Sequence, residues 1–385
     1  MQQPLVNRLR KRERLAFPVW IGLIACAIGG LNSTDVVGSD AEFTIETMAG
    51  TGQSEDIGGD GLATQVNIGW PFGVELGPDS ALYVTECINH RILRVDLKSG
   101  RSRVIAGTGA AGYSPGELPA RDAELNQPYE VRFDRDGNLY VVEMQNHVVR
   151  RIDRRSNVIS TIAGTGEKGF EGDGGPGTAA ELNVPHSIVL DAEGNIYIAD
   201  IGNHRIRRVD SRDGTIETIA GTGEVMLPAE GAIAGDSPLA GPRALAIVDR
   251  TLWVVLREGH SLWTIALDDG TLQHVAGTGE AGYSGDGGPA IEATFNGPKG
   301  LAFDAEGNIY VVDSENDAIR RIDHESGMVT TIAGVGRARK FSGDGGDARL
   351  AEMSQPHGIC VGPDGTIYVA DTLNHRVRAI RSTDQ

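Results

Sequence analysis

A segment of about 57 residues recurs six times in this chain of 385 residues. The clearest copy runs from Thr161 to Asp210. Each copy carries four short runs of apolar and β-branched residues, and a period of this length with four such runs is typical of a propeller blade. The sequence therefore predicts an all-β, six-bladed propeller built from four-stranded antiparallel blades. One proline opens the first strand of every copy: Pro71, Pro128, Pro185, Pro242, Pro298 and Pro356.

The third copy shows how one blade is divided. Short strings rich in Asp, Asn, Ser and Gly separate the strands and have the composition of hairpin turns. The link to each next blade carries a Gly-Asp-Gly-Gly string or a variant of it, and a short alanine-rich stretch that we expect to form one helical turn. The expected strands of this copy are 186–191, 195–200, 205–210 and 215–220.

The two ends of the repeat region are out of phase with a whole blade. The region begins with a strand of the fourth kind (43–50) and ends soon after a strand of the third kind (374–381). Pairing of these two strands would complete the sixth blade and leave no open edge in the ring. We therefore expect a propeller over 43–382, preceded by a linker over 32–42.

The first 31 residues differ from the repeats. Five basic residues precede an uncharged, apolar stretch at 15–31, which is the pattern of an export signal or an N-terminal anchor. The string LIAC at 23–26 resembles a bacterial lipoprotein box, in which Cys26 would be acylated; a plain cleaved signal and an uncleaved anchor remain open. Each alternative predicts an extracytoplasmic propeller, whether periplasmic, secreted or anchored, that meets the membrane only through this segment.

The charge and the cysteine content of the chain restrict the classes of partner and the kind of fold that we expect. The chain has 35 basic and 53 acidic residues, a formal net charge of -18, so its surface repels the phosphates of nucleic acids. It has three cysteines, and beyond Cys26 only Cys87 and Cys360 lie in the repeats, too few for a disulfide framework. We expect a monomeric propeller that does not bind nucleic acid.

The turn between the second and third strands carries a recurrent Asn-His pair. This string resembles the signature of the NHL-repeat family, and the resemblance covers about nine tenths of the chain. It implies a six-bladed propeller, a fold that serves as enzyme, scaffold or ligand-binding module. The pair occurs at Asn89-His90, Asn146-His147, Asn203-His204 and Asn374-His375, with Asn316-Asp317 and Gly259-His260 as departures.

Features present in most blades are interpreted as scaffold, because every blade has the same need for them. They are the acid that ends the second strand, the Asn-His turn and the Gly-Asp-Gly-Gly string. A calcium loop is the functional alternative for that string. Its aspartates lie in different blades, at Asp60, Asp173, Asp286 and Asp344.

One position shows the opposite pattern, with a different large side chain in almost every blade. It directly follows the strand-opening proline, so all six copies should lie at the axial mouth of the propeller. Varied chemistry at geometrically equivalent positions indicates a ligand-binding site. The predicted ligand-binding residues are Phe72, Tyr129, His186, Arg243, Lys299 and His357.

Four of these residues are also candidates for catalysis: His186, His357, Tyr129 and Arg243. His186 and His357 are three blades apart and should face each other, where they could bind a metal or exchange protons. Tyr129 and its neighbour Glu130 could form a proton relay.

The contexts Val-Pro-His-Ser and Gln-Pro-His-Gly resemble those of the peptidyl-hydroxyglycine amidating lyases, propellers whose three zinc-binding histidines lie on alternate blades. Only two histidines correspond here, His186 and His357, so the resemblance does not supply a complete zinc site. Arg243 and Lys299 would instead suit an anion such as a carboxylate or sulfate.

Two functions follow from the sequence. The first is an exported module that binds a small anionic ligand, or a protein or peptide partner, at its axial mouth. The alternative is a metal-assisted lyase or hydrolase, of the amidating-lyase or gluconolactonase-like type, that uses a divalent metal such as zinc or calcium at the same site. No nucleophile motif, phosphate loop or cofactor fingerprint occurs, which argues against kinases, dehydrogenases and triad hydrolases.

Overall fold

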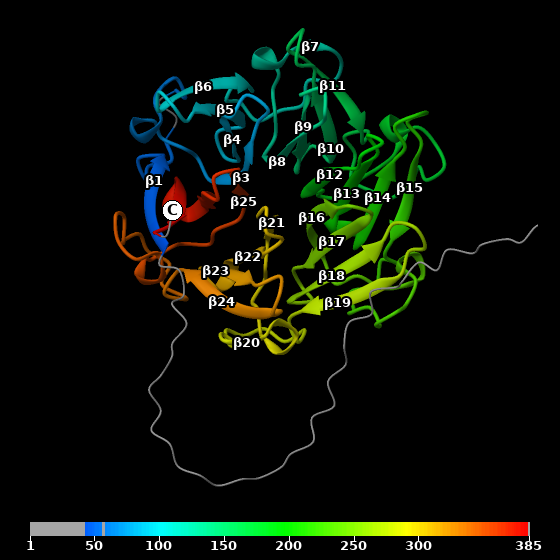
Figure 1. The fold of residues 1–385 in the computed structure, drawn as a ribbon. Coiled ribbons are helices and arrows are strands. Elements are labelled where there is room, and N and C mark those ends of the chain that lie inside the picture. Colours follow the sequence, from blue (N-terminus) through cyan, green and yellow to red (C-terminus); the bar gives the residue numbers. More distant parts are fainter. Residues whose placement is uncertain (1–42, 56–57, 384–385) are drawn as a thin grey trace, which may run out of the picture. The chain divides into compact units, whose positions relative to one another are not determined.

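The computed structural model describes residues 43–55 and 58–383, in which six antiparallel sheets are arranged in a ring around one axis (Figure 1). The innermost strand of each sheet contacts the innermost strands of both neighbouring sheets, and the sixth contacts the first. The predicted six-bladed propeller is therefore confirmed. The inner strands are β3 (Pro71–Leu76), β8 (Pro128–Phe133), β12 (Ser187–Leu190), β16 (Pro242–Val248), β21 (Gly300–Phe303) and β25 (Ile359–Val361).

Each blade continues outward as a meander of hairpins. The second strands are β4 (Leu82–Glu86), β9 (Leu139–Glu143), β13 (Ile196–Asp200), β17 (Thr251–Leu256), β22 (Ile309–Asp313) and β26 (Ile367–Asp371). The third strands are β5 (Arg91–Asp96), β10 (Val148–Ile152), β14 (Arg205–Val209), β18 (Ser261–Ala266), β23 (Ala318–Ile322) and β27 (Arg376–Ser382). The fourth strands are β6 (Arg101–Ala106), β11 (Val158–Ala163), β15 (Ile216–Ala220), β19 (Leu272–Ala276), β24 (Met328–Ala333) and, in the sixth blade, β1 (Phe43–Ala49).

The sixth blade is assembled from both ends of the described chain. Strand β1 lies antiparallel to β27, with Phe43 opposite Ser382 and Ala49 opposite Val377. Ile45 and Ala49 on β1 are fully buried, because this strand packs its apolar face into the ring. The first and last strands of the described residues therefore both contribute to the hydrophobic core.

The links between blades run along the outer edge of the blade that they enter. In three blades the link forms a two-residue strand beside the fourth strand, which makes the sheet five-stranded where four strands were expected: β2 (Gly61–Leu62), β7 (Leu118–Pro119) and β20 (Gly288–Pro289). In the other three blades the same contact is an isolated bridge: Pro176 with Thr215, Ile233 with Thr271, and Thr44 with Asp347. The links thus cover backbone groups at the rim.

Short 3-10 helices follow these contacts, where a single helical turn was expected. The helices within the links are η1 (Ala63–Gln65), η2 (Ala120–Asp122), η3 (Gly177–Ala179), η5 (Ala234–Asp236), η6 (Ala290–Glu292) and η8 (Ala348–Leu350). Three more form the turn between second and third strands: η4 (Ile201–Asn203), η7 (Ser314–Asn316) and η9 (Thr372–Asn374).

The core consists of six apolar clusters, each shared by adjoining blades. Cys87 and Cys360 are buried free thiols within this packing. The part of the chain that the structure describes contains no helix long and apolar enough to span a bilayer. The expectations for 1–31, including acylation of Cys26, and for the linker 32–42 lie outside the described residues.

Candidate functional site

The six residues that follow the strand-opening prolines form a ring at one end of the axis, which we call the mouth ring. Its members are Phe72, Tyr129, His186, Arg243, Lys299 and His357. Five of them are buried, with 4 to 8% of their surface exposed, and Phe72 is half-buried. A solvated position in each blade would leave these side chains exposed, so the observed burial shows that they pack against one another.

Tyr129 is the centre of this packing. Its ring centroid lies 4.6 Å from that of Phe72, 4.4 Å from that of His186 and 6.2 Å from that of His357. Phe72 also stacks on His357 at 4.4 Å. The rings of both predicted histidines thus lie near the same tyrosine.

Two cations complete the mouth ring. The Arg243 guanidinium lies over the Tyr129 ring at 4.7 Å and donates a hydrogen bond to its hydroxyl through Nη2, whereas its Nε is buried and has no hydrogen-bond partner. Lys299 donates to Glu315 at 2.9 Å. Burial, with Arg243 nearby, lowers the pKa of Lys299 to about 8, and burial raises that of Tyr129 to about 12.

Both mouth histidines contact a backbone carbonyl through the same ring nitrogen. Nδ1 of His186 lies 2.7 Å from the Val184 carbonyl, and Nδ1 of His357 lies 2.8 Å from the Gln355 carbonyl. A carbonyl only accepts, so Nδ1 carries the proton and Nε2 of the neutral ring is a free acceptor. Burial, together with Arg243 and Lys299, holds the pKa of both imidazoles well below the usual value.

The backbone before the prolines holds these carbonyls in place. The residue before each proline has a left-handed φ, for example 52° at Val184 and 44° at Gln355. This conformation is costly for a branched residue, and a contact from the preceding blade supports it. The N–H of Val184 donates to His147 Nδ1 at 3.0 Å, and the N–H of Gln355 donates to Asp317 at 2.7 Å. The turn histidines therefore position the mouth ring of the next blade.

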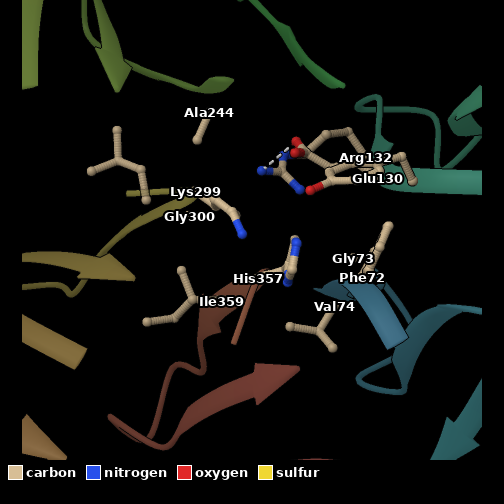
Figure 2. A pocket seen from close by; sticks show the side chains of 13 residues that line it. Phe72, Gly73, Val74, Glu130, Arg132, Ala244, Lys299, Gly300, His357 and Ile359 are labelled. Carbon is tan, nitrogen blue, oxygen red and sulfur yellow. Dashed lines mark ion pairs between the residues drawn. The ribbon is translucent and has the colours of Figure 1, made fainter. Parts of the chain in front are cut away.

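A narrow cavity of about 10 Å³ lies below the mouth ring, enough for about one water. Lys299 and His357 of the mouth ring line it together with Glu130 and Arg132 (Figure 2). Glu130 pairs with Arg132 at 2.7 Å and accepts from Ser187 at 2.9 Å. The hydrogen bonds of Tyr129 and of Glu130 go to different partners, and the expected relay between these two residues stays a prediction. Successive strand residues point to opposite sides, so these two side chains have different partners.

The recurrent acids are scaffold, as predicted, but their main partners were not expected. In blade 3, Asp200 accepts from Asn203 at 2.7 Å and lies 3.5 Å from the fully buried Arg207. The Gly-Asp-Gly-Gly aspartate Asp173 accepts from the same arginine at 2.6 Å, and Phe170 packs over it at 5.1 Å. Ion pairs equivalent to the one between Arg207 and Asp173 join Arg320 to Asp286 and Arg378 to Asp344. These aspartates therefore have a structural role, and calcium binding stays an untested prediction.

Blade 4 replaces this polar group with apolar side chains. Leu256 stands where the other blades have the acid, and Trp263 stands where blades 2, 3, 5 and 6 have the arginine. Both are buried in one hydrophobic cluster. In the turn between them, the N–H groups of Arg257 and Gly259 donate to the backbone that leads into Arg243, at 2.8 and 3.1 Å. Blade 4 thus carries Arg243, the mouth residue whose positive charge has the weakest pairing with carboxylates.

The mouth ring has some of the features of a metal site, but too few ligands. The free Nε2 atoms with Nδ1 bound to carbonyls are the arrangement found in metal-binding histidines. A protein zinc site generally uses three or four ligands, however, and no group of three or more His, Cys, Asp or Glu within 43–55 and 58–383 is placed to hold a metal ion. His186 and His357 could supply two ligands only.

The fold and this site define the chain as a six-bladed β-propeller with a polar axial mouth. Residues 182–209 and 353–380 match the family model of the NHL repeat, and residues 270–340 match that of the Teneurin NHL domain. The chain belongs to the NHL-repeat propellers.

Relatives of this chain are longer proteins. The NHL repeat-containing protein 2 of Bos taurus is 28% identical over 330 residues, which are 78% of this chain and 44% of that protein. The chloroplastic protein SUPPRESSOR OF QUENCHING 1 of Arabidopsis thaliana is 30% identical over 292 residues, 72% of this chain and 27% of that protein. The chain thus spans less than half the length of these two relatives.

A solved structure shares the fold. An auxiliary nutrient binding protein from Bacteroides thetaiotaomicron superposes with a TM-score of 0.64 at 15% identity, covering 91% of this chain and 78% of that one. At this identity the similarity concerns the fold alone.

Proposed function

We propose that this propeller is a binding module whose axial mouth takes an anion, carried by a small molecule or by a peptide partner. The observation that carries the proposal is Arg243, a buried guanidinium that forms no ion pair with any of the residues the structure describes. A buried charge without a counterion costs several kcal/mol. An anionic ligand would offset that cost.

The surroundings of Arg243 support the same conclusion. Lys299 lies in the next blade with one carboxylate partner, Glu315, which it shares with Arg339. Arg257 also has a buried Nε without a hydrogen-bond partner, and its own carboxylate neighbour is Glu258. Positive charge therefore exceeds negative charge on this side of the mouth.

Titration of the purified protein with sodium acetate in an isothermal calorimeter tests the proposal. We expect saturable binding by the natural chain and a loss of roughly 10 to 100-fold in affinity for Arg243→Gln, the range for a hydrogen bond to a charged group. Arg250→Gln is the matched control, because Arg250 is on the same blade but is exposed and paired with Asp268. Equal affinities for all three proteins, or no binding at all, would contradict the proposal.

Metal-assisted lyase or hydrolase activity is the second candidate, favoured by the free Nε2 atoms of His186 and His357. Elemental analysis of the purified protein should then show zinc or another divalent metal in stoichiometric amount. The His186→Ala/His357→Ala variant should lose that metal. Metal-free natural protein would exclude this candidate and leave anion binding untouched.

We also propose that the propeller works outside the cytoplasm, on the strength of the basic and apolar composition of residues 1–31. Mass spectrometry of the mature N-terminus distinguishes the alternatives. Cleavage before an acylated Cys26, cleavage near Ala27, or an intact N-terminus would each identify one of them, and a cytoplasmic, unprocessed protein would contradict export.

A further inference from the structure

Two carboxylates share one guanidinium beneath the mouth ring. Arg132 lies 2.7 Å from Glu130 and 3.1 Å from Glu75, and the three side chains are half-buried along the axis. We call them the floor triad. If both carboxylates are ionised, the triad carries one net negative charge in a place that bulk water solvates poorly. Like charges around a shared partner disfavour the second ionisation, so a proton is readily held by the pair.

The hydrogen bonds around Glu130 fix its position without supplying another positive charge. Ser187 donates to Glu130 at 2.9 Å, and its hydroxyl oxygen in turn accepts from the Leu245 N–H at 3.0 Å. Burial raises the pKa of Glu130 to about 7 and also raises that of Glu75. The other ionisable side chains that face the triad or its cavity are Tyr129, Lys299, His357 and Cys360.

One cavity is lined both by Lys299 of the anion site and by Glu130 and Arg132 of the floor triad. Figure 2 shows the side chains of Lys299, Glu130 and Arg132 around that cavity. An anion held by Arg243 and Lys299 would therefore place a second negative charge close to the carboxylates. Their repulsion lessens if the triad takes up a proton, and about 10 Å³ leaves room for one water, too little for strong screening.

On the premise that the mouth binds an anion, we propose that binding draws a proton from solvent into the floor triad. Ligand binding and proton uptake are then thermodynamically linked, and the anion is held more tightly as the pH falls through neutrality. The mouth becomes a site that loads its ligand in a mildly acidic medium and releases it in an alkaline one.

Calorimetry measures this uptake directly. Acetate is titrated into the whole protein at pH about 7 in buffers that differ in protonation enthalpy, and the dependence of the observed heat on buffer gives the protons exchanged. We expect roughly half a proton per bound acetate, because a group with a pKa near the working pH is half protonated beforehand. Glu130→Gln leaves one carboxylate for one guanidinium and should abolish the uptake.

Glu143→Gln is the matched control. Burial also raises the pKa of Glu143 to about 7, but this residue ends β9, pairs with Arg150 on β10 and does not line the cavity. Its uptake should equal that of the natural chain. The control separates a local effect of the floor triad from a general effect of removing a buried acid.

The outcomes distinguish this inference from the anion-binding proposal beneath it. Acetate binding without proton uptake overturns the inference and leaves anion binding in place. So does an uptake that Glu130→Gln does not change, because the proton then goes to the imidazoles or to Lys299. If the natural chain does not bind acetate, the anion-binding proposal itself fails.

A measurement on the natural chain removes any dependence on how the variants fold. Infrared difference spectra on binding of isotope-labelled acetate should show the carbonyl band of a newly protonated side-chain carboxyl. Its absence contradicts the inference.

Discussion

At the residue scale, the histidine of the Asn-His turn connects one blade to the next. His90, His147 and His260 each accept, through Nδ1, the N–H of the residue before the next strand-opening proline, at 3.2, 3.0 and 3.0 Å. Burial lowers the pKa of each, which keeps the acceptor free of a proton. The recurrent histidine is therefore scaffold, and it acts on the site through the backbone.

This contact predicts a pH dependence of stability. The pKa of His147 is lower in the folded protein than its unfolded value of about 6.5, so its contribution is complete above that pH and is lost as the pH falls below it. Protonation would leave the Val184 N–H facing a donor, a loss of about 1 to 3 kcal/mol. Urea unfolding at several pH values between about 7 and 5 measures this loss of unfolding free energy.

Blade 5 supplies the comparison, because Asp317 accepts the same N–H there. His147→Asp should therefore show a weaker loss of unfolding free energy over this pH range than the natural chain. Parallel pH profiles for the two proteins would show that the histidine does not act through its acceptor nitrogen.

The mouth ring was predicted from the sequence because repeats can be compared with one another, and a varied position stands out against constant ones. Its burial and partners could not be predicted in this way. They depend on side chains from blades far apart in sequence, such as Arg243 on Tyr129. Arg132 was missed altogether, since nothing in its blade distinguishes it from a surface arginine on a strand.

At the scale of the element, each regular blade contains a buried arginine held by an acid, and blade 4 shows that apolar side chains can replace the pair. In blade 5 the pair is Arg320 with Asp313, at 3.3 Å and with both side chains fully buried. In blade 4 Leu256 and Trp263 occupy the two places. A buried ion pair and a well-packed apolar pair can contribute similar stability. Removal of one partner of a buried ion pair is strongly destabilising, because it leaves an uncompensated buried charge.

The apolar pair of blade 4 therefore predicts how a double substitution in blade 5 affects stability. Asp313→Leu alone should destabilise the protein by roughly 3 to 5 kcal/mol, because the part-exposed Asp286 is then the one carboxylate among the described residues that pairs with Arg320. Adding Arg320→Trp, to reproduce blade 4, should recover a substantial part of the loss. Free energies of unfolding in urea provide the measurement, and a double variant no more stable than Asp313→Leu would contradict this account.

The sequence predicted which segments form strands more reliably than it predicted the residues at which these strands begin and end. The expected strand 186–191 is shorter in the structure, where β12 spans Ser187–Leu190. His186 therefore lies just before the strand, whereas the equivalent Tyr129 lies within β8. The short outer strands of the links were not expected, since two-residue pairings leave no periodic pattern.

At the scale of the whole molecule, the pairing of β1 with β27 joins the ends of the ring. Open repeat arrays can lose their terminal units first, whereas a closed ring has no terminal blade. The buried Ile45 and Ala49 add apolar packing to the hydrogen bonds of this joint. Closure therefore makes the stability of every blade depend on one strand.

Two truncations test that dependence. A chain that starts at residue 43 should keep the thermal midpoint of the natural propeller, whereas one that starts at residue 51 should lose roughly 10 °C or more, because it forfeits buried apolar groups and exposes the edge of β27. Differential scanning calorimetry measures the midpoints, and light scattering measures any association through the exposed edge. Equal midpoints for the two chains would show that β1 is dispensable.

The antiparallel joint has a mechanical consequence. Phe43 and Ser382 lie opposite each other at the same end of the pair, so tension applied between the two ends of the propeller loads its hydrogen bonds one after another. Strands pulled in this geometry unzip, whereas strands pulled from opposite ends shear and resist as a group. The joint that protects the ring against heat would thus be its weakest point under force, and stretching would open the propeller at blade 6 before any other blade is strained.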